Sequence, residues 1–198
     1  SFTRPPDVLV DAEGRPIAVI GFDHRSAGQH PVTGEPISEE TYAHEAARIF
    51  AGNDIAVRLM SRVASTPVNV FAMRHLQAAA MINFTASHNP GSDGGIEIFD
   101  GLTGGLANNP VTDPIVARLK DVTELRVAAA DHPLIERIEP PLAAYVQYLR
   151  DTIGVAPDVI NASGIRAIYD AQFGAGVVMR EVLEALGIAT GSLGDATA

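Results

Sequence analysis

The chain has 198 residues, of which 46% are hydrophobic and 19% charged, a balance typical of a globular protein that buries a core. Its formal net charge of −10 argues against nucleic-acid binding, and the absence of cysteine excludes disulfides and thiolate metal sites. No apolar run approaches the roughly 18 residues of a membrane span, so we expect a cytoplasmic protein without membrane association. An anionic ligand would need nearby arginine, lysine, backbone N–H groups or a metal ion to offset the overall charge.

The first predicted elements are a strand, a helix and a second strand. Residues 17–21 form an apolar run that ends in a glycine, which predicts a buried strand. Ser38 is a suitable N-cap for a helix through about Phe50, with acidic residues in its first turn and Gly52 as a stop signal. Residues 55–60 predict the next strand. The helical period places four residues on one apolar face: Tyr42, Ala46, Ile49 and Phe50.

The central part of the chain predicts a helix and then two strands that flank a loop. The pair Thr66-Pro67 predicts a cap followed by proline at the first helical position, in a helix that runs to about Gln77. Residues 80–84 predict a strand that leads directly into a loop around Ser87, and residues 96–99 predict a short strand after that loop.

The next segment predicts a loop and two helices. The glycine- and asparagine-rich stretch 101–110 is typical of an exposed loop. Thr112, with Asp113 and Pro114 after it, predicts the start of a helix to about Val122. Residues 142–153 predict an amphipathic helix.

The end of the chain predicts one more strand-and-helix unit. Residues 166–170 predict a strand, 172–176 a glycine turn, and 177–186 a helix stopped by Gly187. Strands that alternate with helices indicate an α/β fold, here a three-layer sandwich with a mixed, mostly parallel sheet. The predicted organisation is a first domain at 1–153, a linker at 154–164, and a partial second α/β domain at 165–198.

The loop after the third strand is the strongest candidate for a functional site. Open α/β sheets bind ligands at the carboxyl ends of their strands, and Ser87 follows such an end. Gly91, Gly94 and Gly95 permit tight turns and a close approach of backbone N–H groups to an anion. A serine here could carry a phosphoryl group, whose charge would need donors and Mg²⁺. The residues alone leave a merely polar turn open as the alternative.

Adjacent Ser87 and His88 are not interpreted as a nucleophile and its base, because neighbours on an extended chain point to opposite sides. We expect His88 to contact substrate or to orient the loop. Asp100 and Asp113 are assigned to a turn and a helix start. The remaining histidines show no metal-ligand spacing and are interpreted as surface or packing residues: His24, His30, His44, His75 and His132.

Several motifs, in order along the chain, resemble one enzyme family. The string Thr85-Ala86-Ser87-His88-Asn89-Pro90 resembles the phosphoserine loop of the α-D-phosphohexomutase superfamily, which includes phosphoglucomutases and phosphomannomutases. The resemblance extends over roughly residues 17–187 and implies the first domain of that family plus the start of its second. Further segments with this resemblance are Gly21-Phe22-Asp23-His24-Arg25, Ser65-Thr66-Pro67-Val68, Gly94-Gly95-Ile96, Gly104-Gly105, Val111-Thr112 and residues 169–176.

The resemblance implies a phosphoryl-transfer mechanism. In the family, a phosphorylated serine donates its phosphoryl group to a hexose monophosphate, and the resulting bisphosphate reorients and returns the other phosphate. Ser87 corresponds to this phosphoserine, which also ligates Mg²⁺ through its phosphate, and His88 to the neighbouring active-site histidine. Arg25 and Asn89 are candidates for phosphate or substrate binding, although we favour a structural pair of Arg25 with Asp23.

The family pattern is broken at two places that matter for charge. Glu97 occupies the position of the family's acid/base lysine, which turns a positive group into a negative one beside an anion. At about 4 Å and an effective dielectric near 20, such like charges repel by about 4 kcal/mol. The family's aspartate-rich metal loop, Asp-Gly-Asp-x-Asp-Arg, has no counterpart in the 198 residues. The alternative to an active mutase is therefore a catalytically degenerate relative that serves as a sugar-phosphate-binding or structural module.

Overall fold

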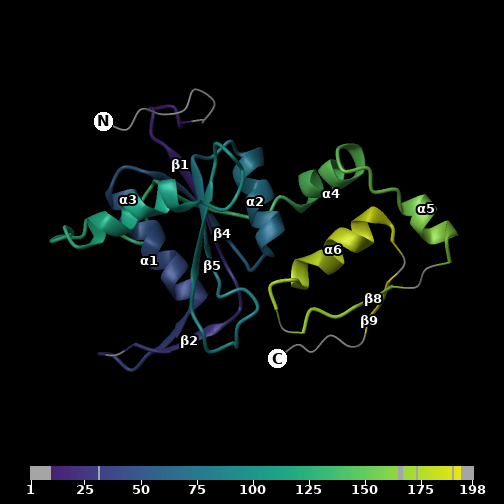
Figure 1. Ribbon diagram of the computed structural model, residues 1–198, viewed down its shortest axis with the longest axis horizontal. Coiled ribbons are helices and arrows are strands. Elements are labelled where there is room, and N and C mark those ends of the chain that lie inside the picture. The colour runs from purple at the N-terminus through teal and green to yellow at the C-terminus, as the bar shows by residue number, and fades with distance from the viewer. Residues whose placement is uncertain (1–9, 31, 165–166, 173, 189, 193–198) are drawn as a thin grey trace.

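The computed structural model describes residues 10–30, 32–164, 167–172, 174–188 and 190–192 (Figure 1). Its central element is a five-stranded sheet in the order β6-β5-β1-β4-β7. Neighbouring strands run parallel except for β5 and β6, which confirms the predicted mixed, mostly parallel sheet. The strands are β1 (Ile17–Phe22), β4 (Ala56–Met60), β5 (Ala80–Phe84), β6 (Ile96–Asp100) and β7 (Ile135–Ile138).

The three inner strands are nearly continuous apolar runs because helices cover both of their faces. Every residue of β1 is buried, and Ile20 lies in register with Leu59 of β4 and Ile82 of β5. The edge strand β7 was not predicted, since its short sequence carries two exposed charged residues between two isoleucines.

The helices α1 (Glu39–Gly52) and α2 (Thr66–His75) lie on opposite faces of this sheet. Phe84 of β5 stacks on Tyr42 of α1, whereas the preceding Asn83 bonds to Asn69 of α2. Successive side chains of a strand point to opposite faces, so the two contacts place the helices on either side. Figure 1 shows the sheet between them, as the predicted three-layer arrangement requires.

Helix α1 begins as predicted but buries a different face. Ser38 is its N-cap and forms a capping box with Thr41. The predicted apolar face lies at the flank of the interface, and Tyr42 is 40% exposed. The fully covered side consists of Glu39, Ala43, Ala47 and Ala51. Small alanine side chains let the helix approach the sheet closely, which leaves the larger side chains at the edges of the contact.

Two helices start earlier than the sequence predicted. The N-cap of α2 is Ser65 rather than Thr66, which places Pro67 at the second helical position. The helix α3 (Asn109–Leu119) begins inside the stretch that was predicted as loop, with Asn108 as its cap. Pro114 therefore lies in the interior of α3 and not in its first turn. At this interior position it removes one helical hydrogen bond.

A small hairpin beside α1 was not predicted. It consists of β2 (Ser26–Gln29) and β3 (Pro36–Ser38), which pair antiparallel. Its strands are short and largely polar, so the sequence carries little periodic signal for them.

The end of the chain forms a second, smaller unit. Its helices are α4 (Leu142–Asp151), α5 (Pro157–Ala162) and α6 (Val177–Leu186), and its parallel strands are β8 (Ala167–Tyr169) and β9 (Thr190–Ser192). The segment predicted as a linker contains α5, because Pro157 at the start of this helix favours helix entry. Helix α6 has the predicted bounds, and Gly187 ends it in the left-handed conformation at φ 77°. The domain boundaries themselves stay a prediction.

A second apolar core joins this unit to the main sheet. Val178, Val182 and Leu186 of α6 pack with Tyr145 and Val146 of α4. Ala64, just before α2, and Val68 of α2 complete the cluster. Within the ranges described above, no helix is both long and apolar enough to cross a membrane.

Candidate active site

The loop that carries Ser87 leaves the carboxyl end of β5 and is closed at its base by backbone pairing. The N–H of buried Thr85 donates to the carbonyl of Gly95 at 2.9 Å, which joins the two ends of the loop. The Thr85 hydroxyl accepts from the Ser87 N–H at 3.0 Å. Ser87 itself has a left-handed backbone, at φ 55°, and its side chain is exposed. The loop thus turns sharply at Ser87 and presents this residue outward.

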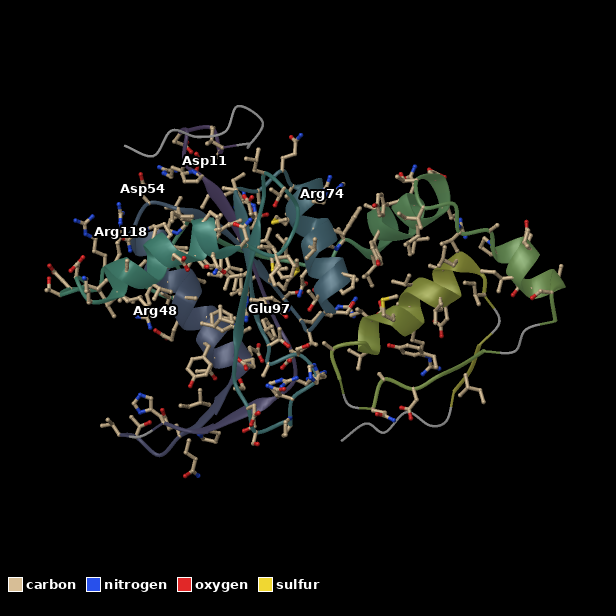
Figure 2. All side chains as sticks on the ribbon, viewed as in Figure 1. Asp11, Arg48, Asp54, Arg74, Glu97 and Arg118 are labelled. Atoms are coloured by element: carbon tan, nitrogen blue, oxygen red, sulfur yellow. The ribbon has the colours of Figure 1, made fainter. Side chains whose placement is uncertain are left out.

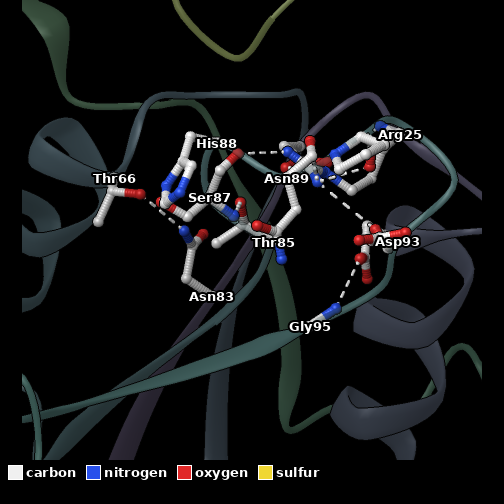
Figure 3. A network of polar contacts seen from close by, with 12 residues as sticks. Arg25, Thr66, Asn83, Thr85, Ser87, His88, Asn89, Asp93 and Gly95 are labelled. Atoms are coloured by element: carbon white, nitrogen blue, oxygen red, sulfur yellow. Dashed lines mark hydrogen bonds and ion pairs between the residues drawn. The ribbon is translucent and has the colours of Figure 1, made fainter.

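The side chain of Arg25 holds the loop in this shape by bonding to the loop's main-chain carbonyls. Its guanidinium donates to the carbonyl of Ser87 at 2.6 Å and to the carbonyls of Asn89, Pro90 and Asp93 at 3.4 Å each. The arginine is itself fixed by buried Asp23, which accepts from its Nε at 2.7 Å and from its backbone N–H at 2.9 Å. Figure 3 shows Arg25 beside the loop with these contacts. The favoured structural pair with Asp23 is present, and it positions a side chain that organises the loop.

Glu39 supports the far end of the loop from below. This residue is fully buried at the start of α1, and its Oε1 accepts from the Gly95 N–H at 3.1 Å. Among the described residues, its Oε2 has no hydrogen-bond partner. Burial raises the pKa of the Glu39 carboxyl, and nearby Asp23 adds to this, while the Gly95 N–H and Arg25 oppose it. The sequence pointed to Glu39 only as a favourable charge in a first helical turn.

A cavity of about 530 Å³ opens beside Ser87. One wall comes from the strand ends and loops of the main sheet, and it includes Asp23, His24, Arg25, Thr85, Ser87 and Gly91. A second wall is the start of α2, with Ser65, Thr66 and Pro67. The third is the glycine turn of the second unit, with Gln172, Gly174 and Ala175. This volume lies within the range of small-molecule sites.

The structure groups only some of the predicted site residues around this cavity. Ser87 and Arg25 line it, together with His24, which the sequence analysis interpreted as a surface or packing residue. His88 is exposed, and its Nδ1 lies 3.5 Å from the Ser87 hydroxyl oxygen, at the outer limit of a hydrogen bond. The side chain of Asn89 is exposed, and only its carbonyl contacts Arg25.

Glu97 lies in β6, in register with Asn83 of β5, and is not among the residues that line the cavity (Figure 2). Its Oε2 is buried and has no hydrogen-bond partner in the part of the chain that the structure describes. The carboxylate therefore sits near the base of the loop without a compensating donor at that oxygen.

The residues present fit a magnesium ion only in part. Mg²⁺ is usually held by one or two carboxylates together with phosphate oxygens. Both oxygens of Asp23 are engaged by Arg25, and one oxygen of Glu39 by Gly95. Over the described ranges, no three His, Asp or Glu side chains gather closely enough to hold a metal.

A buried polar chain beneath the cavity was missed from the sequence. Asn69 of α2 donates to Asn83 of β5 at 3.0 Å, and Asn83 donates to the Thr66 hydroxyl at 3.0 Å. Both asparagines are almost fully buried. The available signal was Asn83 itself, a polar residue inside an otherwise apolar strand. Gln172 was also missed as a wall residue, because its turn is distant in sequence and it has an unusual φ of 46°.

Comparisons with known proteins agree on one family. Residues 7–126 match the family described as phosphoglucomutase/phosphomannomutase, alpha/beta/alpha domain I. The chain is 30% identical over 191 residues to a phosphoglucomutase of Staphylococcus haemolyticus, and 30% identical over 185 residues to a phosphoglucosamine mutase of Ralstonia nicotianae. The alignments cover 93% and 92% of this chain but only 32% and 37% of those proteins.

A solved structure supports the fold. A Thermus thermophilus protein assigned as a phosphomannomutase superposes with a TM-score of 0.64 at 24% identity, over 91% of this chain and 37% of that one. The chain thus spans about a third of the length of the relatives that it matches.

Proposed function

Because the chain belongs to the phosphoglucomutase/phosphomannomutase family and contains its α/β/α domain I, we propose that it carries the phosphoserine of a hexose-phosphate mutase. The observation that carries this proposal is the position of Ser87. Arg25 donates a hydrogen bond to the carbonyl of Ser87, and Ser87 lines a cavity at the carboxyl ends of parallel strands. The relatives are isomerases that act on sugar phosphates, as their names state.

In the proposed reaction, phosphorylated Ser87 gives its phosphoryl group to a free hydroxyl of a hexose monophosphate. The bond between Ser87 Oγ and phosphorus breaks while a bond from the sugar oxygen to phosphorus forms, and the sugar hydroxyl loses its proton as Ser87 Oγ gains one. The bisphosphate then turns round and returns its other phosphoryl group to Ser87. We propose His88, whose Nδ1 lies 3.5 Å from Ser87 Oγ, as the side chain that moves these protons.

Charge neutralisation is the main requirement for such a transfer. We propose that Mg²⁺, bound through the phosphate on Ser87, supplies the positive charge that offsets the phosphate in the loaded enzyme. The chain's own contribution is to hold the loop, because Arg25 donates to four main-chain carbonyls between residues 87 and 93. The remaining carboxylate ligands of the ion are not supplied by the described residues.

A second candidate function is favoured by Glu97. Glu97 lies beside the base of the loop, and its buried Oε2 has no hydrogen-bond partner among the described residues. Its negative charge disfavours a phosphate dianion on Ser87. This is consistent with a degenerate sugar-phosphate-binding or structural module. In that case Ser87 would not accept a phosphoryl group. The two candidates therefore differ in whether Ser87 becomes phosphorylated, which a mass measurement detects directly.

Intact-mass measurement tests the proposal. The 198-residue chain, and the longest natural form of the protein, are incubated with Mg²⁺ and glucose 1,6-bisphosphate. The mutase predicts a phosphate adduct that Ser87→Ala abolishes and that Arg25→Lys slows by roughly tenfold, because a lysine lacks the planar fork that reaches Asp23 and the loop carbonyls at once. Arg118→Lys, on exposed α3, is the matched control and should behave like the parent.

Glu97→Lys separates the two causes of low activity. If the carboxylate limits the transfer, this variant should accept more phosphate than the parent. The absence of any adduct in all forms, together with no interconversion of glucose 1-phosphate and glucose 6-phosphate, would reject the mutase in favour of the binding module.

A further inference from the structure

The buried polar chain below the Ser87 cavity has a defined direction. Asn69 is fully buried, and its amide nitrogen donates to the carbonyl of Ala64 at 3.1 Å and to the side-chain oxygen of Asn83 at 3.0 Å. A backbone carbonyl can only accept, so the contact with Ala64 fixes which end of the Asn69 amide is the nitrogen. Both of its N–H groups are then used, and Asn83 must present its oxygen to Asn69.

The orientation of Asn83 decides what the Thr66 hydroxyl can do. With its oxygen turned to Asn69, the Asn83 nitrogen faces Thr66 and donates to its Oγ1 at 3.0 Å. The threonine oxygen is therefore an acceptor in this contact, and its own hydrogen is left for another group. Within the described part of the chain, no acceptor contacts this hydroxyl.

Thr66, which carries this free donor, lines the cavity in which a phosphate on Ser87 is expected. Thr66 begins α2, and it lines the same cavity as Ser87 (Figure 3). His24 and Arg25 are the basic residues in the described wall of the cavity, and Arg25 is committed to Asp23 and to loop carbonyls. A neutral hydroxyl held as a donor is thus available where cations are scarce.

We propose that the Thr66 hydroxyl donates a hydrogen bond to a phosphoryl oxygen on phosphorylated Ser87, and that Asn83 and Asn69 act as positioning residues that keep it a donor. The proposal rests on the proposed function, since it requires a phosphate at Ser87. A hydrogen bond to an ionised group is about twice as strong as one between neutral groups, and this one stabilises the dianion against the negative charge of Glu97.

The test measures the phosphate directly. Phosphoserine is encoded at position 87 of the 198-residue chain during synthesis, and its second pKa is followed by phosphorus NMR titration. A donor to the dianion lowers this pKa, so Thr66→Val and Thr66→Ala should each raise it by about 0.5–1 unit. Thr66→Ser keeps the hydroxyl and should titrate like the parent.

Thr33→Val is the control for loss of a threonine hydroxyl, because Thr33 lies in an exposed turn distant in sequence from Ser87. It should leave the phosphate pKa unchanged. Circular dichroism identifies any variant that fails to fold, and the alanine variant, which is not β-branched, replaces the valine variant in that event. An unchanged phosphate pKa in the folded hydroxyl-free variant would overturn the proposal.

The encoded phosphoserine separates this proposal from the mutase itself. If the unmodified protein takes no phosphate from a sugar bisphosphate but the Thr66 variants still shift the phosphate pKa, the mutase fails and the donor stands. If transfer occurs but the pKa does not move, the mutase stands and the donor fails.

Discussion

Glu39 combines complete burial with a carboxylate that has only one hydrogen bond within the described structure. Leaving a polar atom unpaired in the interior costs about 1–3 kcal/mol, and more for a charged group. Because burial raises the pKa of Glu39 above its ordinary value of 4.5, the folded protein favours the neutral acid more strongly than the unfolded chain does. The stability that the neutral acid provides is complete below the unfolded pKa and is lost as the pH rises through the higher folded pKa.

Glu39→Gln should therefore be more stable than the parent at neutral pH, by about 1–3 kcal/mol. The glutamine oxygen can still accept from Gly95, and the amide cannot ionise. The advantage should grow as the pH rises from about 4.5 and level off above the folded pKa, in urea unfolding measured from about pH 4.5 to 8. Glu124→Gln, an exposed change of the same charge, should show no such trend. A difference between Glu39→Gln and the parent that is independent of pH would contradict the argument.

At the scale of elements, the contact between β1 and α2 depends on a missing side chain. A Cβ on Gly21 would collide with the side-chain nitrogen of Asn69 and would lie 2.9 Å from the side-chain oxygen of Asn83. Gly21 is not at a positive φ, so space rather than backbone conformation explains the glycine. The strand thus leaves room for the buried polar chain to cross from α2 to β5.

Gly21→Ala should destabilise the protein by about 1–3 kcal/mol, the usual result of overpacking a core. Gly105→Ala is the control, since its nearest neighbour would be 3.8 Å away, and it should change stability little. Because the collision involves Asn69, the cost of Gly21→Ala should fall in an Asn69→Ala background. Urea unfolding of the four combinations measures this, and strictly additive effects would show that the clash is not the cause.

The elements that the sequence predicted best are those whose capping residues and apolar pattern lie within the element itself. Helix α6 was predicted to the residue because Gly187 supplies a left-handed stop directly after an apolar stripe. The predicted start of α3 at Thr112 was wrong, because the helix begins after Asn108 and Thr112 lies inside it. Asn108 makes no side-chain cap bond, so its local signal is weak. The strands β2, β3 and β7 are short and partly polar, and β7 in addition pairs with β4, which is distant along the chain.

At the scale of the molecule, a salt-bridge network joins the second unit to the main sheet. Arg62, after β4, donates to Glu181 of α6 at 2.6 and 3.0 Å and to Glu139 at 3.0 Å. The hydrogen bond from Arg62 lowers the pKa of Glu181, and those from Ser61 and then Arg62 lower the pKa of Glu139. The side chains of Arg62, Glu139 and Glu181 are 40–70% exposed. Exposed pairs are screened by solvent, so we expect a small contribution next to that of the shared apolar core.

A double-mutant cycle of Arg62→Ala and Glu181→Ala should give a coupling free energy of about 0.5–1 kcal/mol in low salt, and less at high ionic strength. The pair Arg180 and Glu184 lies within one turn of α6 and provides the control cycle, with about 0.3–0.5 kcal/mol expected. Zero coupling between Arg62 and Glu181 at low salt would mean that the apolar core alone holds the second unit.

The site could be predicted only in part, because its assembly is not local. Ser87 was singled out by its motif and by its place after a strand, and the pair of Asp23 and Arg25 was favoured because arginine–carboxylate pairs are common. The contact of Arg25 with the Ser87 carbonyl joins residues 62 positions apart. The cavity wall at Gln172 and the Asn69-to-Thr66 chain likewise depend on packing between elements, which periodicity along one segment does not reveal.

The hydrogen bonds from Arg25 to the carbonyls of the Ser87 loop have a consequence for protein engineering. The loop around Ser87 owes its shape to partners outside itself: Asp23 and Arg25 on one side, and Glu39 on the other. A hexapeptide grafted alone onto another scaffold would therefore not keep this conformation. The transplantable unit is the loop together with the strand end that bears Asp23 and Arg25 and the start of the helix that bears Glu39.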